Sequence, residues 1–173
     1  MTTNEYVTPP RGIKLKWKGM LDLDLLYKEI KRWLEDKGFF KEQTSEKKYT
    51  ERKYPGGIKN VYINWKNENK VSDYFRYHID VDFLLLGISD VELQLPDGNK
   101  KKVQKGDFEI KIMAYVQTGS EEWDKMKALE KMYYNLIIRR RLEAYQRDLY
   151  DKTYKFQVMI KDFFIKGEFA EGG

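Results

Sequence analysis

Three side chains with the chemistry of metal ligands alternate along one stretch of the chain, at His78, Asp80 and Asp82. Alternate residues of a β-strand project from one face, about 6.6 Å apart, so these groups can converge on a hard divalent cation. A ladder of cross-strand charge pairs explains the pattern equally well and is the interpretation we favour. No metal or cofactor is therefore predicted. The expected partners in the ladder are Lys66, Arg76, Glu109 and Lys111.

The composition leaves few routes to catalysis. The 173 residues include no Cys and one His, which excludes disulfides, thiolate metal sites and cysteine nucleophiles, and nearly excludes multi-histidine zinc sites. The loops also lack a glycine pattern that would cradle a phosphate. We therefore expect a binding protein rather than an enzyme.

Basic residues gather in three places. They are a stretch near the N-terminus in which Lys alternates with apolar residues, a loop near residue 101, and the middle of the last expected helix. Such clusters neutralise phosphates, and one alternative function is that of an RNA- or ribosome-associated basic protein. The formal charge of +5 is small because 28 acidic residues nearly balance 33 basic ones. The candidate nucleic-acid residues are Lys14, Lys16, Lys18, Lys101, Arg139, Arg140 and Arg141.

Apolar and aromatic residues are abundant in the C-terminal segment, beyond what one sheet face is expected to cover. Aromatic residues and arginine are typical of protein interfaces, so we expect the distal part of this segment to contact a protein partner or a second copy of the chain. For the proximal part, packing on the chain's own sheet is an equal alternative. The predicted partner-binding residues are Leu142, Tyr145, Leu149, Phe156, Met159 and Phe163.

These residues need elements to position them, and the first elements have clear patterns. Residues 1–10 are polar and are expected to form a disordered tail. From Ile13 to Lys18 apolar and basic residues alternate, which predicts an edge strand. A helix with apolar residues at helical spacing follows, capped by Asp22 or Asp24 and ended by Gly38.

The middle of the chain predicts an antiparallel meander. Turn sequences at Pro55–Gly57 and Pro96–Asn99 separate runs in which apolar and polar residues alternate. With the first strand, these runs give six expected strands. The later five lie at 48–54, 58–66, 75–83, 91–95 and 108–116.

The C-terminal segment predicts one long helix, because no Gly or Pro occurs from Ser120 to Lys166. Thr118 and Ser120 are alternative N-caps. Such a helix would be about 70 Å long, so we expect it to bend between Arg139 and Thr153. The predicted organisation is an α+β domain over 11–141, a distal helical extension over 142–166 and a tail over 167–173.

The predicted fold class is α+β, an antiparallel meander with one helix after the first strand and a long, bent C-terminal helix. This element order is similar to that of the helix-grip or START-like group, in which a curved sheet wraps a long final helix. The similarity gives a second alternative function, a carrier of a small apolar ligand. Its pocket would be lined by Trp17, Trp65, Phe75, Tyr77 and Tyr133.

The sequence also bears on location. The longest apolar run, from Phe83 to Leu86, is far shorter than the roughly 18 residues that a spanning helix needs. The first ten residues lack the basic and then apolar layout of a signal peptide. We therefore expect no transmembrane segment and a cytoplasmic location.

Overall fold

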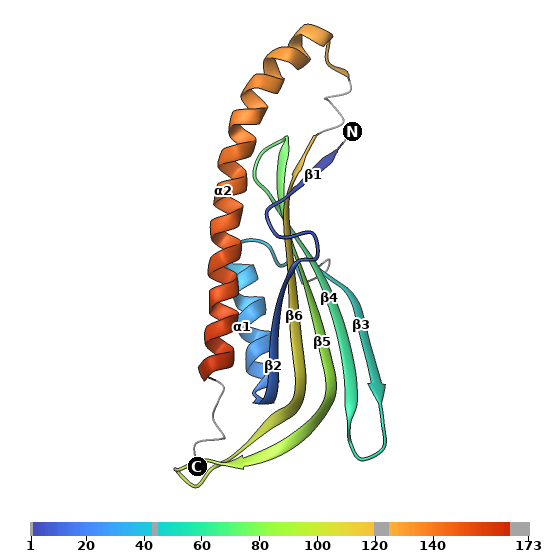
Figure 1. Cartoon of the computed structure of the whole chain (residues 1–173), viewed down its shortest axis with the longest axis vertical. Coiled ribbons are helices and arrows are strands. Elements are labelled where there is room, and N and C mark those ends of the chain that lie inside the picture. Colours follow the sequence, from blue (N-terminus) through green and yellow to red (C-terminus); the bar gives the residue numbers. More distant parts are fainter. Residues whose placement is uncertain (1, 43–44, 120–124, 167–173) are drawn as a thin grey trace.

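The computed structural model describes residues 2–42, 45–119 and 125–166. Within them the fold is α+β, with one antiparallel sheet of six strands and two helices, which confirms the predicted class and element order. Both helices lie on the same side of the sheet (Figure 1). We call that side of the sheet the inner face and the opposite side the outer face.

The strands follow one another across the sheet as a meander, in the order β1-β6-β5-β4-β3, and β2 also pairs with β6. β1 and β2 thus occupy successive lengths of the same edge, which confirms that the alternating stretch from Ile13 is an edge strand. The strand bounds are β1 Thr3–Tyr6, β2 Ile13–Leu21, β3 Glu46–Lys53, β4 Lys59–Lys70, β5 Phe75–Gln94 and β6 Lys100–Thr118.

Helix α1, Leu23–Asp36, forms where its sequence pattern predicts it. Asp22 is the N-cap, and its carboxylate accepts a hydrogen bond from the Leu25 backbone N–H at 3.1 Å. Gly38, at a φ of 78°, ends the helix, and its N–H donates to the Glu35 carbonyl oxygen. The buried side of α1 lies against the inner face of the sheet.

Strands β5 and β6 are longer than the sequence pattern indicates. The expected strand at 91–95 is the end of β5, which continues through a register shift between Leu86 and Ser89. The hairpin around Pro55–Gly57 forms as predicted, between β3 and β4. The number of strands is therefore as expected, although the set differs, because two predicted runs are one strand and β1 is additional.

The prediction of a disordered tail is wrong for residues 3–8. β1 pairs with β6, with Thr3 opposite Thr118 and Tyr6 opposite Tyr115. Thr8 is buried, and its hydroxyl accepts a hydrogen bond from the Ala114 backbone N–H at 3.2 Å. This polar segment is ordered because its backbone pairs with β6. The pattern of apolar residues in the sequence gives no sign of such backbone pairing.

The core lies between the inner face and the helices. In β5 and β6 every second residue from Phe75 to Leu85 and from Phe108 to Val116 is buried. Trp65 on β4 is fully buried, with its ring centroid 4.9 Å from those of Tyr27 and Phe83. The alternate positions on the outer face are polar or charged for most of their length.

Helix α2, Ala128–Lys166, is a single helix of 39 residues, about 58 Å long at 1.5 Å per residue. α2 is unbroken from Arg139 to Thr153, where a bend was predicted. Figure 1 shows the curve of the helix toward the start of α2, where its first turns extend past the strands. The predicted start is also wrong, because Thr118 ends β6. The alternative cap, Ser120, lies outside the described residues.

The second half of α2 belongs to the core. Leu149, Phe156 and Ile160 are each fully buried, and Phe164 is 5% exposed. Residues 142–166 are therefore an integral part of the α+β domain and not an extension from it. The predicted tail at 167–173 lies outside the described residues.

In the part of the chain that the structure describes, neither helix combines the length and the apolar character needed to cross a membrane.

Candidate functional site

The first half of α2 carries four exposed side chains on one side of the helix. Leu129, Met132, Tyr133 and Leu136 are 82%, 69%, 65% and 70% exposed. Their spacing of three, four and seven residues places them on one face of two successive helical turns. We call these four residues the outer stripe.

The outer stripe faces away from the sheet. On this half of α2 the side toward the sheet carries Tyr134, whose ring centroid lies 6.4 Å from that of Tyr74, and Ile138, which packs against the core. At 100° per residue, the middle of the stripe is on the opposite side of the helix from Ile138. An apolar stripe turned to solvent has no role in packing the chain's own core.

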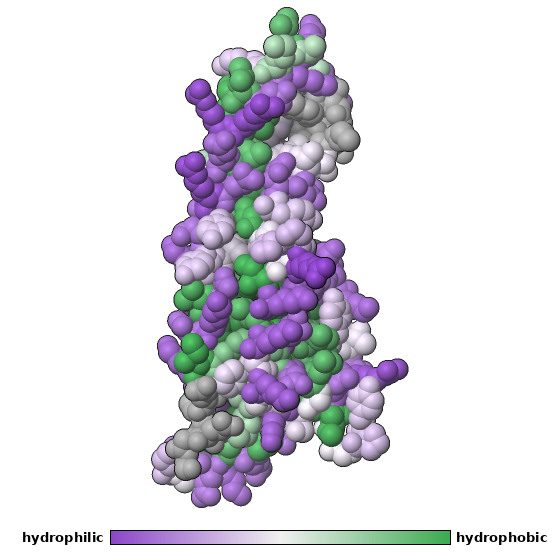
Figure 2. Space-filling model, in the orientation of Figure 1, coloured by the Kyte–Doolittle hydropathy of each residue, from purple (hydrophilic) through white to green (hydrophobic). Residues whose placement is uncertain are grey.

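The surroundings of the outer stripe are basic. From residue 127, just before α2, to residue 147 the chain has six Lys or Arg residues against two Glu. Arg140 follows Leu136 by one turn on the same face, and Arg139 and Arg141 flank it, all three exposed. Figure 2 shows hydrophobic and hydrophilic side chains interspersed along the part of α2 that extends past the strands.

The six residues predicted to bind a partner all lie on the core side of α2. Leu149 and Phe156 are fully buried, so their side chains are not on the surface where a partner would meet them. Leu142, Tyr145, Met159 and Phe163 are partly buried against the same core. The apolar surface left without a partner is therefore in the other half of the helix from the one predicted.

The reason for this difference lies in the sheet. The repeat of Leu142, Leu149, Phe156 and Phe163 at seven-residue spacing is the signal of a packed helix face, and the chain's own sheet and α1 supply the surface it packs on. The outer stripe stays uncovered because it is on the side of α2 that faces away from the sheet, and the first turns of α2 also extend past the strands (Figure 1). A sequence pattern identifies an apolar stripe but not what covers it.

The predicted nucleic-acid residues do not converge. Lys14, Lys16 and Lys18 lie on β2 and are exposed on the outer face, with Lys16 opposite Glu109 and Lys18 opposite Asp107 in register. Lys101 pairs with Asp22 at 3.0 Å, near the start of α1. The three arginines, Arg139, Arg140 and Arg141, belong to α2, across the sheet from the lysines of β2. The basic charge is thus distributed over separate surfaces.

The three candidate metal ligands share the outer face, as the alternation predicts, but they have different partners. His78 Nε2 lies 3.0 Å from Gln117 Oε1, whereas Asp82 accepts a hydrogen bond from the Asn64 side-chain amide. Asp80 lies opposite Lys66 and Asp82 opposite Lys111, as the charge ladder predicts. Among the described residues, no three His, Asp or Glu side chains are placed to hold a metal ion.

The residues proposed to line a carrier pocket do not enclose a common space. Trp65, Phe75 and Tyr77 are at most 3% exposed, and each packs against the ring of another aromatic residue, as Phe75 does against Tyr145 with centroids 4.8 Å apart. Trp17 packs beside Phe164 at 6.2 Å. Tyr133 belongs to the outer stripe, on the far side of α2. Among the described residues, Trp65, Phe75 and Tyr77 thus belong to the packed core.

Comparison of the chain with protein-family models, with curated proteins and with solved structures finds no match.

Proposed function

We propose that this chain is a binding protein whose outer stripe contacts an acidic, amphipathic segment of another protein. The observation that supports this function is the exposure of Leu129, Met132, Tyr133 and Leu136, between 65% and 82% each, on one helix face. Two turns of solvent-facing apolar residues are the arrangement that pairs with an apolar partner helix. Exposed apolar patches of this kind are typical of interaction sites.

The charges around the outer stripe select the partner. Arg139, Arg140 and Arg141 at one end, with Lys127 and Lys131 near the other, give both ends of the stripe a positive potential. A partner that places Leu or Met on the stripe and Asp or Glu at its margins satisfies both features.

A second copy of this chain fits the outer stripe poorly in a parallel arrangement. In a parallel pair of α2 helices, each of the arginines at 139–141 lies beside its own equivalent in the other copy. Like charges then oppose each other, which disfavours that mode of self-association.

The test is binding to a designed probe, a helical peptide with Leu at positions i, i+3, i+4 and i+7 and Glu at the flanking positions. We expect Leu136→Lys to weaken binding at least about tenfold, because removing one buried Leu contact costs about 1.5–3 kcal/mol. Ile165→Lys is the matched control, since Ile165 is 66% exposed on the same helix but lies 29 residues away from Leu136. Fluorescence anisotropy of the labelled peptide measures both affinities.

Three outcomes would contradict the proposal. One is an equal loss of affinity in Leu136→Lys and Ile165→Lys. Another is a Lys-flanked version of the peptide that binds as well as the Glu-flanked one. The third is binding of a single-stranded RNA with a steep salt dependence. If that binding is lost when Arg139–Arg141 are replaced by Gln but is kept in Leu136→Lys, the nucleic-acid alternative is favoured.

A further inference from the structure

Strand β3 ends the strand order on one side of the sheet, and all eight of its residues, Glu46–Lys53, are exposed. Figure 1 shows β3 at the edge of the sheet that is farther from α2. Among the described residues, no strand pairs with β3 on the side away from β4. We call that side the free edge. A strand edge without a partner offers its backbone groups to an added strand.

The hydrogen bonds of the β3–β4 hairpin show which residues turn their backbone toward the free edge. The Tyr54 N–H donates to the Ile58 carbonyl oxygen at 2.7 Å, next to the turn. Along an antiparallel pair, hydrogen-bonded and non-hydrogen-bonded residue pairs alternate, so every second residue points its N–H and C=O away from the partner strand. In the register of β3 on β4, those residues are Tyr49, Glu51 and Lys53.

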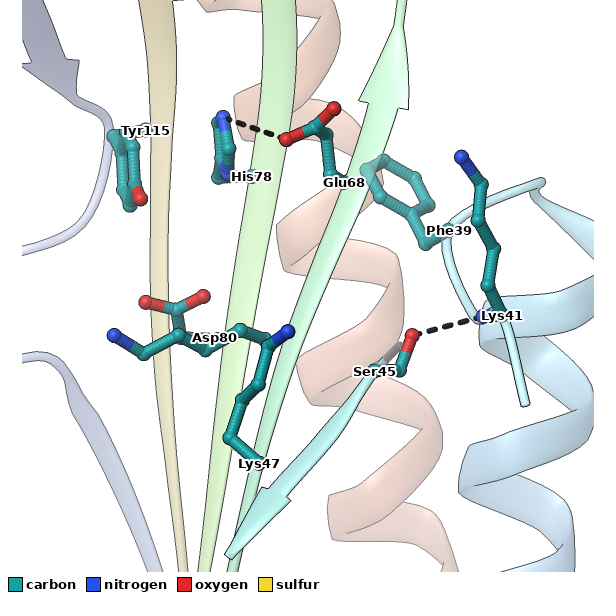
Figure 3. Close-up of a pocket in the computed structure, with 9 residues that line it drawn as sticks. Phe39, Lys41, Ser45, Lys47, Glu68, His78, Asp80 and Tyr115 are labelled. Carbon is teal, nitrogen blue, oxygen red and sulfur yellow. Dashed lines mark hydrogen bonds and ion pairs between the residues drawn. The ribbon is translucent and has the colours of Figure 1, made fainter. Parts of the chain in front are cut away.

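The start of β3 is fixed by hydrogen bonds at Ser45, which is buried. Its carbonyl oxygen accepts from the Lys66 N–H at 2.8 Å, and its Oγ accepts from the Lys41 N–H at 2.8 Å (Figure 3). From Lys48 onward, β3 keeps one register with β4. The free edge from Tyr49 to Lys53 is thus a regular stretch of about 17 Å that is already extended before a partner arrives.

The acids and the bases of β3 differ in their contacts. Glu51 pairs with Lys59 at 3.5 Å, and Glu46 accepts a hydrogen bond from the Trp65 indole N–H at 3.3 Å. The bases, in contrast, form no ion pair with any other described residue: Lys47, Lys48, Arg52 and Lys53. The free edge therefore presents positive charge that the rest of the chain leaves unpaired.

An added strand meets different side chains on the two faces of the sheet. Tyr49 lies opposite the buried Ile63, so its ring, 54% exposed, is on the inner face. Lys48 and Arg52 occupy alternate positions and are on the outer face. Because the side chains of an added strand alternate in the same way, acidic residues on one face match the two bases, and apolar residues on the other match the Tyr49 ring.

We propose that the free edge of β3 binds an extended segment of another protein, which adds to the sheet as an antiparallel strand with alternating acidic and apolar residues. Every strand pair of this sheet is antiparallel, so such a segment continues its pattern. Lysine on an edge strand discourages pairing with another basic edge, whereas an acidic strand is attracted by it. The free edge lies apart from the outer stripe on α2, so the two sites are separate.

The direct test is binding of a short, labelled peptide of alternating Glu and Val, measured by fluorescence anisotropy. Directly opposite residues of a hydrogen-bonded antiparallel pair share a face, so the Val N–H groups of the peptide point toward β3. N-methylation of the Val residues should weaken binding at least about tenfold, and N-methylation of the Glu residues should have a much smaller effect. The proposal is wrong if the unmodified peptide does not bind, or if methylating Glu costs as much as methylating Val.

Amide hydrogen exchange, followed by NMR, locates the bound peptide. Binding should slow the exchange of the Tyr49 and Glu51 amides at least about tenfold, because their N–H groups point to the free edge. The Thr50 amide is the internal control, since its position in the register already pairs it with β4. Slowing that spares Tyr49 and Glu51, for example slowing confined to the first half of α2, would refute the site.

Substitutions at the free edge separate backbone pairing from charge. Glu51→Pro removes an N–H that points to the free edge and leaves the bonds to β4, so it should bind about tenfold more weakly than Glu51→Ala, which loses the same carboxylate. Arg52→Glu should weaken binding at least about threefold. Lys14→Glu is its matched control, with the same reversal of charge at the opposite edge of the outer face.

Two results with these variants would contradict the proposal. Equal losses in Arg52→Glu and Lys14→Glu would show diffuse attraction to a basic protein. A dimer of the chain alone, detected by light scattering and abolished in Glu51→Pro, would assign the free edge to a second copy. Neither experiment depends on α2, so failure here leaves the test of the outer stripe unaffected.

Discussion

One buried hydroxyl links the sheet to the final helix. Tyr77 on β5 is 3% exposed, and its hydroxyl donates to Asp148 Oδ2 on α2 at 2.8 Å. Lys152 Nζ lies 2.7 Å from both oxygens of the same carboxylate. The carboxylate is thus held by two donors, one from the sheet and one from the next turn of the helix.

Removing that hydroxyl tests its contribution. We expect Tyr77→Phe to lower the free energy of unfolding by about 1 kcal/mol, the usual net value of a buried hydrogen bond, since the ring packing remains. Tyr154→Phe is the control, because Tyr154 is 56% exposed on the same helix and should change stability by less than about 0.5 kcal/mol. Urea unfolding followed by circular dichroism measures both, and equal effects would show that the link carries no stability.

The two halves of helix α2 have different roles, and substitution to Ala separates them. Phe156 is fully buried, with its ring centroid 4.6 Å from that of Trp33 on α1, so Phe156→Ala should cost about 3–5 kcal/mol. Leu136 is 70% exposed, and Leu136→Ala should cost less than about 0.5 kcal/mol. Thermal or urea unfolding of both variants checks the contrast. A large loss for Leu136→Ala would mean that the outer stripe is part of the fold.

At the scale of the whole molecule, one buried and two partly buried tyrosines limit stability in alkali. Burial, with smaller effects from nearby carboxylates, raises the pKa of Tyr27 and of Tyr115 to about 12, and burial raises the pKa of Tyr77 as well. Tyrosines of an unfolded chain titrate near pH 10. Folding therefore favours the protonated hydroxyls, so their contribution is full below about pH 10 and declines as the pH rises toward 12.

This decline is measurable. The free energy of unfolding should be nearly constant from neutral pH to about pH 10 and should then fall. Tyrosinate absorbance gives the titration directly, with the same chain in concentrated denaturant as the reference. If folded and denatured chains titrate together, the three hydroxyls are accessible to hydroxide and the expected alkaline loss does not occur.

Sequence patterns predicted those elements that are determined by residues close together in the sequence. The alternation of β2, the Asp22 cap, the Gly38 stop and the hairpin at Pro55–Gly57 all depend on neighbours in sequence. β1 was missed because its order comes from pairing with β6. The abundance of apolar residues in the C-terminal segment was recognised, but the half of α2 that keeps an exposed stripe was not predicted. Local spacing does not determine which side of a helix the sheet covers.

The shared edge of β6 also determines the order in which the molecule can be completed. Leu21 pairs with Gln104 and Thr3 with Thr118, so the first strands meet partners that are synthesised some hundred residues later. Pairings of such long sequence separation carry a large loop-closure cost and form slowly. During synthesis the apolar sides of β2 and α1 therefore remain without their partners until β6 is made. The β3–β4 hairpin can form as soon as both of its strands are synthesised. The sheet can close at its N-terminal edge only after the chain has been synthesised through the end of β6, at Thr118.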